Sequence, residues 1–256
     1  MKQVLKSTLS KLGYEIRKRP VTPQKLHDGV VVGWQRNGRD IRFYLENCFD
    51  LIGKDLFNCR FFEEDELEYL RGIVDPQEVM LDVGANIGNH TVYFAAMIGA
   101  GKVIAFEPGG WAYPRLAFNV ALNGLQDRVT LHKVALSDAP GTAHMRLLAA
   151  DNHGTLAILS GDEGEGPVET VPVRKGDDYL TDERVGFVKI DAERHEMKVL
   201  NGLQKTLSRD KPIVMVEVLQ TERAALEAFL ADFGYATLMA RERYGDIVNV
   251  ICRTAA

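Results

Sequence analysis

The residues from Asp82 to Gly88 carry the clearest chemical signal in the sequence. They spell Asp-Val-Gly-Ala-Asn-Ile-Gly and directly follow the apolar run 79–81. A glycine-rich turn between a strand and a helix lets the backbone approach a nucleotide closely. The next predicted strand ends at Glu107, where an acid is placed to accept hydrogen bonds from both hydroxyls of an adenosine ribose. The pattern therefore predicts an adenosine-containing ligand.

NAD and S-adenosylmethionine both contain adenosine, and the details of the turn favour S-adenosylmethionine. The dinucleotide fingerprint is G-x-G-x-x-G, whereas this chain has Asn86 in place of the middle glycine and Asn89 in place of the last. A carboxylate at Asp82 would repel a pyrophosphate but suits the ammonium group of a methionine. An NAD-dependent oxidoreductase is the disfavoured alternative. A glycine turn that serves only the packing of a strand on a helix is the non-functional interpretation.

A second group of reactive side chains follows the fourth predicted strand. The segment from Lys189 to Glu196 contains three carboxylates and a histidine. Transfer of a methyl group to a weakly acidic acceptor needs a base, or a metal ion that lowers the pKa of that acceptor. We therefore expect Asp191 and Glu193 to act as a general base or, with Glu217 at the end of the fifth strand, to bind Mg²⁺. Glu196 is expected to cap the helix that follows.

Two histidines are further candidates for the base. His195 lies at the start of the helix after the acidic segment, where a solvated surface role is the alternative. His153 lies in the segment 141–175 and reaches a substrate if that segment folds over the strand ends. A structural role in its loop is the alternative for His153.

The elements that must position these residues alternate between strands and helices. From Val79 onward, apolar runs of about five residues alternate with helical patterns at about 89–98, 113–122, 195–207 and 221–233. This alternation predicts a mainly parallel sheet that is covered on both faces. The chain closes with a hairpin around residues 244–246.

Two segments add to this predicted core, which we expect to span residues 76–256. Residues 1–75 are predicted to form an N-terminal extension, with a β-hairpin around Asn37-Gly38 and a helix at 65–74. The segment at about 141–175 is predicted to be an inserted hairpin with a mobile tip. Both additions are expected to set the specificity for the acceptor. The first twenty residues are basic with helical apolar spacing, which predicts either peripheral contact with a membrane or a terminal helix packed on the domain.

The motifs DVGANIGNHT, AFEP, NVALNG, VALSD, VKIDAExxE and IVMVEV occur in this order between Phe61 and Val218. In order and spacing they resemble the FkbM-type methyltransferases. The resemblance implies an α/β class I methyltransferase fold, which is Rossmann-like, with a seven-stranded, mainly parallel sheet and an antiparallel last strand. It also implies S-adenosylmethionine-dependent O-methylation. The acceptors in that family are commonly hydroxyls of sugars in glycans, glycolipids or glycosylated natural products, or of macrolides.

The resemblance also implies roles for individual residues. The residues expected to hold the cofactor are Asp82, Gly84, Asn86, Gly88, Asn89, Glu107, Ala135, Ser137 and Asp138. Asp191 and Glu193 are expected to face the methyl group and the acceptor. The chain departs from the family pattern D-V-E-G-x-E after Glu193, where Arg194 and His195 replace a glycine and a small residue. This departure is the one feature that supports the remaining alternative, a methyltransferase fold that binds a partner without catalysis.

Composition excludes some classes of protein. The chain has 256 residues with a net charge of -5, so it lacks the excess positive charge that binding to nucleic acid needs. Its three cysteines form no paired motif, which predicts free thiols in a reducing compartment. No apolar run is long enough to span a membrane and no signal peptide is recognised, so a cytoplasmic location is expected. The expected partner is a small-molecule or glycan acceptor.

Overall fold

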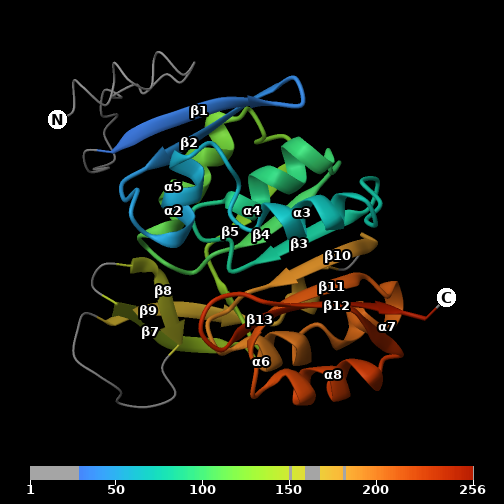
Figure 1. Ribbon diagram of the computed structural model, residues 1–256. Coiled ribbons are helices and arrows are strands. Elements are labelled where there is room, and N and C mark those ends of the chain that lie inside the picture. The colour runs from blue at the N-terminus through green and yellow to red at the C-terminus, as the bar shows by residue number, and fades with distance from the viewer. Residues whose placement is uncertain (1–28, 150–151, 159–167, 181–182, 256) are drawn as a thin grey trace.

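The structure, a computed structural model, describes residues 29–149, 152–158, 168–180 and 183–255. Its centre is a seven-stranded sheet with the strand order β12-β13-β11-β10-β3-β4-β5 (Figure 1). The strands are β3 Val79–Val83, β4 Val103–Phe106, β5 Val129–His132, β10 Val185–Ile190, β11 Ile213–Leu219, β12 Tyr235–Glu242 and β13 Ile247–Thr254. Strands β11, β10, β3, β4 and β5 pair in parallel, and β13 is antiparallel to both of its neighbours. The predicted mainly parallel sheet with an antiparallel last strand is confirmed.

The central strands are apolar along their whole length because both faces of the sheet are covered. All five residues of β3 and all four of β4 are buried. Alternate residues of β3 point to opposite faces, so Met80 belongs to one buried cluster and Leu81 to the other. Such continuous apolar runs are typical of parallel strands packed between two layers of helices.

Helices of the N-terminal half cover one face of the sheet, and helices of the C-terminal half cover the other (Figure 1). The first group comprises α3 Glu64–Arg71, α4 Asn89–Val92, the π-helix η1 Tyr93–Ile98 and α5 Ala112–Leu122. The second comprises α6 Glu196–Asn201, α7 Gln204–Asp210 and α8 Arg223–Ala231. This arrangement leaves the carboxyl ends of β3, β4 and β10 at one edge of the sheet, where open α/β sheets bind ligands.

Two predicted helices are interrupted. The helix predicted over 89–98 begins as α4 and continues as η1. The helix expected at about 195–207 is split into α6 and α7, because the Asp177 carboxylate accepts hydrogen bonds from the backbone N–H groups of Lys205 and Thr206 at 2.9 and 3.0 Å. Asp177 belongs to the short 3₁₀-helix η2 (Gly176–Tyr179). Because this cap comes from another segment, the sequence of α7 itself does not predict where that helix begins.

The described part of the N-terminal extension begins with a hairpin of β1 (Val30–Arg36) and β2 (Arg39–Leu45). At its turn, Asn37 and Gly38 have φ angles of 49° and 75°, as a two-residue type I′ turn requires. The predicted hairpin is confirmed. Helix α2 (Leu51–Phe57) follows, and the Phe61 ring packs edge-on against the Tyr93 ring of η1. The extension therefore shares a core with the main sheet.

Two asparagines of α5 attach the hairpin to this core. The Asn119 amide accepts from the Tyr44 backbone N–H at 2.7 Å and donates to the Ile87 carbonyl at 2.8 Å. One turn later, the Asn123 amide accepts from Arg42 N–H at 2.9 Å and donates to Arg42 C=O at 2.7 Å. Asn119 lies in α5, and Asn123, one turn later on the same face, caps its carboxyl end. The two side chains therefore hydrogen-bond the backbone along an edge of β2, where another strand would otherwise pair.

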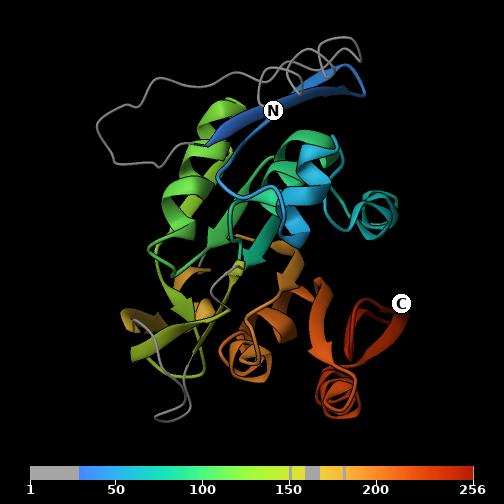
Figure 2. The ribbon, with the colours of Figure 1, turned by 60° about the vertical axis from the view of Figure 1, so that its left-hand side comes forward.

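The segment 141–175 is larger than the single hairpin predicted for it. Strands β7 (Gly141–Ala149) and β9 (Val168–Arg174) pair antiparallel as expected, but β8 (Asn152–Ile158) adds to β7 and the short strand β6 (Ala135–Leu136) adds to β9. The result is a second, four-stranded sheet beside the main one (Figure 2). The predicted tip, at about residues 160–167, lies outside the described residues.

The basic N-terminal helix predicted from the first twenty residues also lies outside the described residues. In the part of the chain that the structure describes, no helix is long and apolar enough to cross a membrane.

The two asparagines of α5 give a matched test of how the extension is attached. Asn119 is fully buried, so Asn119→Ala leaves a buried N–H and a buried C=O unpaired at about 1–3 kcal/mol each. We expect a loss of about 3 kcal/mol, or a fall in Tm of roughly 8 °C. Asn123→Ala, whose partners are exposed to water, should cost less than about 1 kcal/mol. Equal losses in thermal unfolding would contradict this attachment.

Candidate functional site

The glycine turn after β3 is shaped by the neighbouring end of β10. Gly84 has a φ of +77°, and a Cβ atom on it would lie 1.7 Å from the carbonyl oxygen of Asp191. The Asp191 N–H in turn donates to the Val83 carbonyl at 3.0 Å. Only glycine fits both the left-handed backbone and this close approach, so the turn and the acidic segment form one unit.

Lys189 is the buried cation of this unit. Its ammonium is 3.6 Å from Asp82 Oδ1 and 3.3 Å from Asp191 Oδ2, and it donates to the Gly84 carbonyl at 3.0 Å. The Asp82 carboxylate, which is fully buried, also accepts from the Thr91 hydroxyl at 2.5 Å. Although burial lowers the pKa of Lys189, the charges of Asp191 and Asp82 outweigh it and hold that pKa above its ordinary value. Lys189 therefore stays protonated.

Glu107 follows β4 and faces the same turn. Its carboxylate accepts hydrogen bonds from the backbone N–H groups of Asn86 at 2.8 Å and Gly109 at 2.7 Å. Burial raises the pKa of Glu107 to about 7, and the two N–H groups oppose that rise. A carboxylate has about four lone-pair sites, so Glu107 keeps the capacity to accept hydrogen bonds from a ligand.

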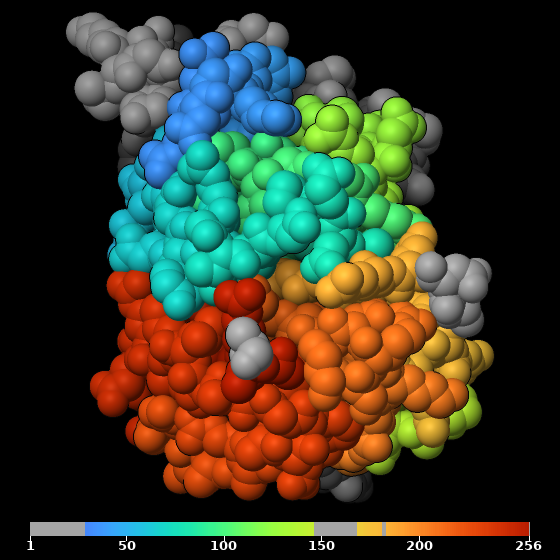
Figure 3. All heavy atoms as spheres, turned by 90° about the vertical axis from the view of Figure 1, so that its right-hand side faces the viewer, coloured from blue at the N-terminus to red at the C-terminus, as the bar shows by residue number. Residues whose placement is uncertain are grey.

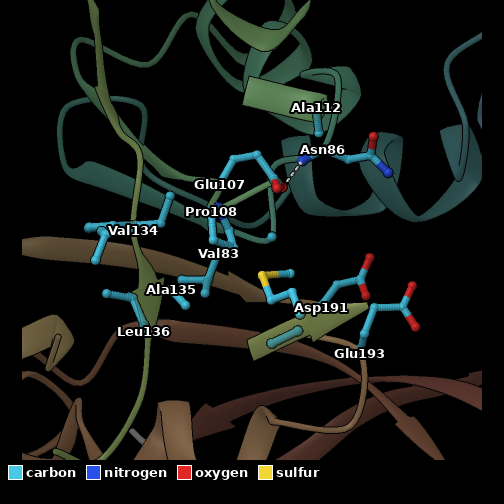
Figure 4. A pocket seen from close by; sticks show the side chains of 14 residues that line it. Val83, Asn86, Glu107, Pro108, Ala112, Val134, Ala135, Leu136, Asp191 and Glu193 are labelled. Carbon is cyan, nitrogen blue, oxygen red and sulfur yellow. Dashed lines mark hydrogen bonds between the residues drawn. The ribbon is translucent and has the colours of Figure 1, made fainter. Parts of the chain in front are cut away.

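A cavity of about 630 Å³ opens over these strand ends (Figure 4). It is lined by Val83, Gly84, Asn86, Phe106, Glu107, Pro108, Ala112, Val134, Ala135, Leu136, Met145, Asp191, Ala192 and Glu193. Figure 4 shows polar groups on two sides, Asn86 with Glu107 and Asp191 with Glu193, and the apolar side chains of Val134 and Leu136 at a third. We call this cavity the first pocket.

A second pocket of about 550 Å³ adjoins the first. It is lined by Asp50, Leu51, Ile52, Phe62, Asn86, Ile87, Trp111, Asp191, Glu193, Glu217 and Tyr244. Asn86, Asp191 and Glu193 line both pockets. The shared wall therefore contains both acids predicted to act at the reacting centre.

The acidic segment after β10 is held in an unusual backbone conformation. Glu193 and Arg194 have φ angles of 50° and 72°, a left-handed region that costs a non-glycine residue about 1–2 kcal/mol. The Glu196 carboxylate accepts from the backbone N–H groups of Ala192 and Arg194, both at 3.0 Å. These groups lie in the loop before α6, so Glu196 holds that loop, whereas its predicted role was to cap the helix itself. The left-handed angle at Arg194 explains why a glycine suits this position.

The Glu193 side chain has no ion-pair partner among the described residues. Burial, followed by the negative charges of Asp191 and Glu196, raises its pKa to about 8. The pKa of Glu217 is also raised, by burial and then by the charge of Asp191. The second pocket thus holds carboxyl groups that bind a proton more tightly than ordinary ones.

Several predicted site residues are placed elsewhere. Gly88 packs against Leu116. The Asn89 amide bonds both the N–H and the C=O of Phe62 at 3.0 Å. His195 Nε2 lies 2.8 Å from Ser137 Oγ, which donates to Asp138 at 3.0 Å. None of these residues, and not Asp82 either, belongs to the described lining of either pocket. The predicted site residues that do line a pocket are Gly84, Asn86, Glu107, Ala135, Asp191, Glu193 and Glu217. His153 lies in β8, and its side chain is outside the described part of the structure.

The residues present do not fit the predicted magnesium site. Within the described ranges, no group of three or more histidine, cysteine, aspartate or glutamate side chains is arranged to hold a metal ion. The positive charge beside Asp191 is supplied by Lys189. A lysine there weakens the attraction of this carboxylate for a second cation.

Sequence reasoning missed Lys189, Phe62 and Tyr244. Lys189 had a signal, because a lysine in a fully buried parallel strand needs counter-ions and acids at strand ends are the nearest ones. Phe62 and Tyr244 lie far from the motifs in the chain, and only folding brings them to the second pocket.

A family model described as the methyltransferase FkbM domain matches residues 82–237 of this chain. The AMB antimetabolite synthetase AmbE of Pseudomonas aeruginosa is 30% identical, covering 59% of this chain and 9% of AmbE. The hexuronic acid methyltransferase AglP of Haloferax volcanii is 28% identical, covering 61% of this chain and 62% of AglP. The 2-O-methyltransferase NoeI of Sinorhizobium fredii is 26% identical, covering 53% and 61%. The chain thus spans less than two thirds of the length of each of these relatives.

Solved structures share the fold at lower identity. A methyltransferase FkbM from Methylobacillus flagellatus aligns with a TM-score of 0.52 and 18% identity, covering 77% of this chain and 52% of that one. TYW2 of Pyrococcus horikoshii in complex with MeSAdo aligns with a TM-score of 0.50 and 15% identity, covering 87% and 70%. The expected class I methyltransferase fold is confirmed.

The strained loop predicts an unusual stabilising substitution. Arg194→Gly relieves a left-handed non-glycine residue at the cost of some backbone entropy, and we expect a net gain of about 0.5–1 kcal/mol in the free energy of unfolding. Lys198→Gly, at an exposed position inside α6, is the control and should lose about 1 kcal/mol. Denaturant titration measures both. A loss in Arg194→Gly comparable with the control would show that the loop is not strained at this residue.

Proposed function

This chain belongs to the FkbM methyltransferase family, and on that premise we propose that it transfers a methyl group from S-adenosylmethionine to a hydroxyl group of a sugar. The observation that carries the proposal is the pair of adjoining pockets with a shared wall of Asn86, Asp191 and Glu193. Group transfer needs a donor and an acceptor held side by side at one reacting centre. We assign the first pocket to the donor and the second to the acceptor.

The first pocket fits S-adenosylmethionine in its chemistry. Glu107 offers carboxylate lone pairs for ribose hydroxyls. Phe106, Val134 and Leu136 supply an apolar surface for adenine. Asp191 and Glu193 offer carboxyl groups where the methionine end would lie, and its positive groups would favour the ionised form of Glu193. Asp82 supports this site indirectly, by fixing Lys189 and Thr91.

When bound, S-adenosylmethionine supplies a methyl group that is already activated by its positive sulfur. The remaining task of the chain is to align the hydroxyl and accept its proton. We assign the proton to Glu193, because its carboxyl group lines both pockets and burial raises its pKa to about 8. Asp191, fixed by Lys189 at 3.3 Å, is suited to orient the hydroxyl by accepting a hydrogen bond.

The lining of the second pocket supports a neutral acceptor with hydroxyl groups. One part is apolar or aromatic, with Phe62, Trp111 and Tyr244, and another carries carboxyl groups. A sugar ring has the same two-sided character, since its C–H face suits an aromatic ring and its hydroxyls suit carboxylates. The described lining includes no basic side chain, so it fits a neutral acceptor better than an anionic one. The name of AglP describes methylation of a hexuronic acid, which supports a carbohydrate acceptor although that sugar is anionic, and the name of NoeI describes 2-O-methyl transfer, which supports a hydroxyl acceptor.

Glu107 gives a test of the donor pocket. Glu107→Gln removes a charge-assisted hydrogen bond worth about 1.5–3 kcal/mol, so we expect S-adenosylmethionine and S-adenosylhomocysteine to bind about 10–100-fold more weakly in calorimetric titration. Glu222→Gln removes a carboxylate from the surface and should leave both affinities unchanged. Unchanged affinity in Glu107→Gln, or no binding to the native chain, would remove the assignment of this pocket.

Glu193 gives a test of the reacting centre through pH. A base is active only when deprotonated, and the pKa of Glu193 is raised from 4.5 to about 8, so activity should increase as the pH rises towards 8. With S-adenosylmethionine saturating, kcat/KM for the acceptor reports the complex of the chain with its donor, whose positive charge lowers the pKa of Glu193. We expect this kcat/KM to fall about tenfold per pH unit below a midpoint that lies between pH 4.5 and 8.

Glu193→Gln should lower kcat by about 100-fold or more and abolish this pH dependence, while leaving the affinity for S-adenosylhomocysteine within a few-fold. If Asp191→Asn abolished the pH dependence and Glu193→Gln kept it, the base would be Asp191.

A further inference from the structure

The acceptor pocket is bordered by two chain segments that lie outside the motifs of the donor site. Leu51, Ile52 and Phe62 come from the N-terminal extension, and Tyr244 comes from the turn between β12 and β13. Residues 62 and 244 are far apart in the sequence, and the residues next to them make contacts that join the two segments. Figure 3 shows the segments directly against each other, the extension in cyan on the C-terminal hairpin in red.

Glu63 is the residue on which these contacts converge. It is 5% exposed and precedes α3 with a left-handed φ of 61°. One carboxylate oxygen lies 2.9 Å from His90 Nε2 in α4. The other accepts from Asn249 Nδ2 in β13 at 2.7 Å and lies 3.3 Å from Arg243 Nε. A single buried carboxylate therefore joins the extension, the helix after the glycine turn and the C-terminal hairpin.

Charge explains why this junction is stable. Burial alone would raise the pKa of Glu63, but the hydrogen bond and charge of His90 and the charge of Arg243 bring it to about 2. Glu63 is thus ionised at neutral pH, and charge-assisted hydrogen bonds are roughly twice as strong as neutral ones.

Phe62 and Tyr244, which are adjacent in sequence to Glu63 and Arg243, both line the acceptor pocket. Phe62, next to Glu63, is also held by the Asn89 amide through both of its backbone groups at 3.0 Å. Tyr244 is next to Arg243, whose guanidinium lies 5.3 Å from the centre of the Phe62 ring and donates to Glu66 at 2.9 Å. Neither Glu63 nor Arg243 lines the first pocket, which is built on the ends of β3, β4 and β10, so displacement of either residue should move the two aromatic walls more than the donor site.

We propose that Glu63 is a positioning residue for the acceptor, which holds the aromatic walls of Phe62 and Tyr244 against the C–H face of a sugar ring. The proposal rests on the proposed function and adds to it the part of the chain that recognises the acceptor: the N-terminal extension with the β12–β13 turn. The insert 141–175, which we also expected to set specificity, contributes Met145 to the donor pocket and no residue to the described lining of the acceptor pocket.

The test compares, in the full chain, a variant of Glu63 with a control variant two residues later in the sequence. The probes are the methyl α-glycosides of glucose, galactose, mannose and fucose, with radiolabelled S-adenosylmethionine as donor, and the best acceptor of the four is used for kinetics. Glu63→Gln removes the charge that pairs with His90 and Arg243. We expect KM for the acceptor to rise tenfold or more, kcat to change less than threefold, and the affinity for S-adenosylhomocysteine to change less than twofold.

Asp65→Asn is the matched control, because it breaks an ion pair between α3 and β12 (Arg241 at 2.7 Å) at an exposed position outside the pocket. It should leave all three quantities unchanged. If Glu63→Gln does not fold, Arg243→Lys keeps the charge but cannot bridge Glu63 and Glu66 together, and it should give the same change in KM alone.

An unchanged KM in a folded Glu63→Gln or Arg243→Lys variant overturns the proposal. So does a parallel loss of donor affinity, which would indicate general loosening of the fold. If the native chain binds S-adenosylmethionine but methylates none of the four glycosides, the pocket does not hold a sugar ring and the proposal fails. If the native chain does not bind S-adenosylmethionine, the proposed function itself fails.

Discussion

The site depends on the pairing of one buried ammonium group with two carboxylates. Burial of a charge costs several kcal/mol unless its partners are well placed, and Lys189 finds them in Asp82, Asp191 and the Gly84 carbonyl. These partners come from the ends of β3 and β10, so satisfying Lys189 fixes two neighbouring strand ends relative to each other. The close approach of Gly84 to Asp191 follows from this pairing. The two acids also differ in their surroundings, because Asp191 is paired with Lys189, whereas Glu193 has no ion-pair partner among the described residues and its pKa is raised to about 8.

A second theme is that polar side chains on the core helices attach the added segments. Asn119 and Asn123 bind the edge of β2, Asn89 binds the backbone of Phe62, and His90 binds Glu63. Each of these residues belongs to a motif that suggested a role in ligand binding or family membership. Their amide and imidazole groups are buried or partly buried, where an unpaired polar group is costly. The N-terminal extension is therefore fixed by specific hydrogen bonds as well as by its share of the core.

The loop after β10 shows how a departure from a family pattern is accommodated. A glycine at position 194 would adopt the observed left-handed backbone without strain, whereas Arg194 adopts it because the Glu196 carboxylate holds the N–H groups of Ala192 and Arg194. Strained backbone at a site persists when surrounding contacts determine it. Arg194 therefore adopts a backbone conformation that a glycine would also adopt.

The sequence by itself determined the strands, their mainly parallel arrangement, and the glycine turn and acid of the proposed donor pocket. Those features rest on local chemistry: apolar runs specify buried strands, and Gly84 and Glu107 fall at strand ends where their roles follow from backbone geometry. Tertiary structure alone decided the break between α6 and α7, the four-stranded second sheet, and the turning of His195 towards Ser137. It also decided the acceptor side, because Phe62, Glu217 and Tyr244 meet only through contacts between segments distant in the chain. Spacing in the sequence indicates which residues share a turn or a face. A pocket wall made of two segments that are distant in the sequence depends on tertiary packing, which no local pattern predicts.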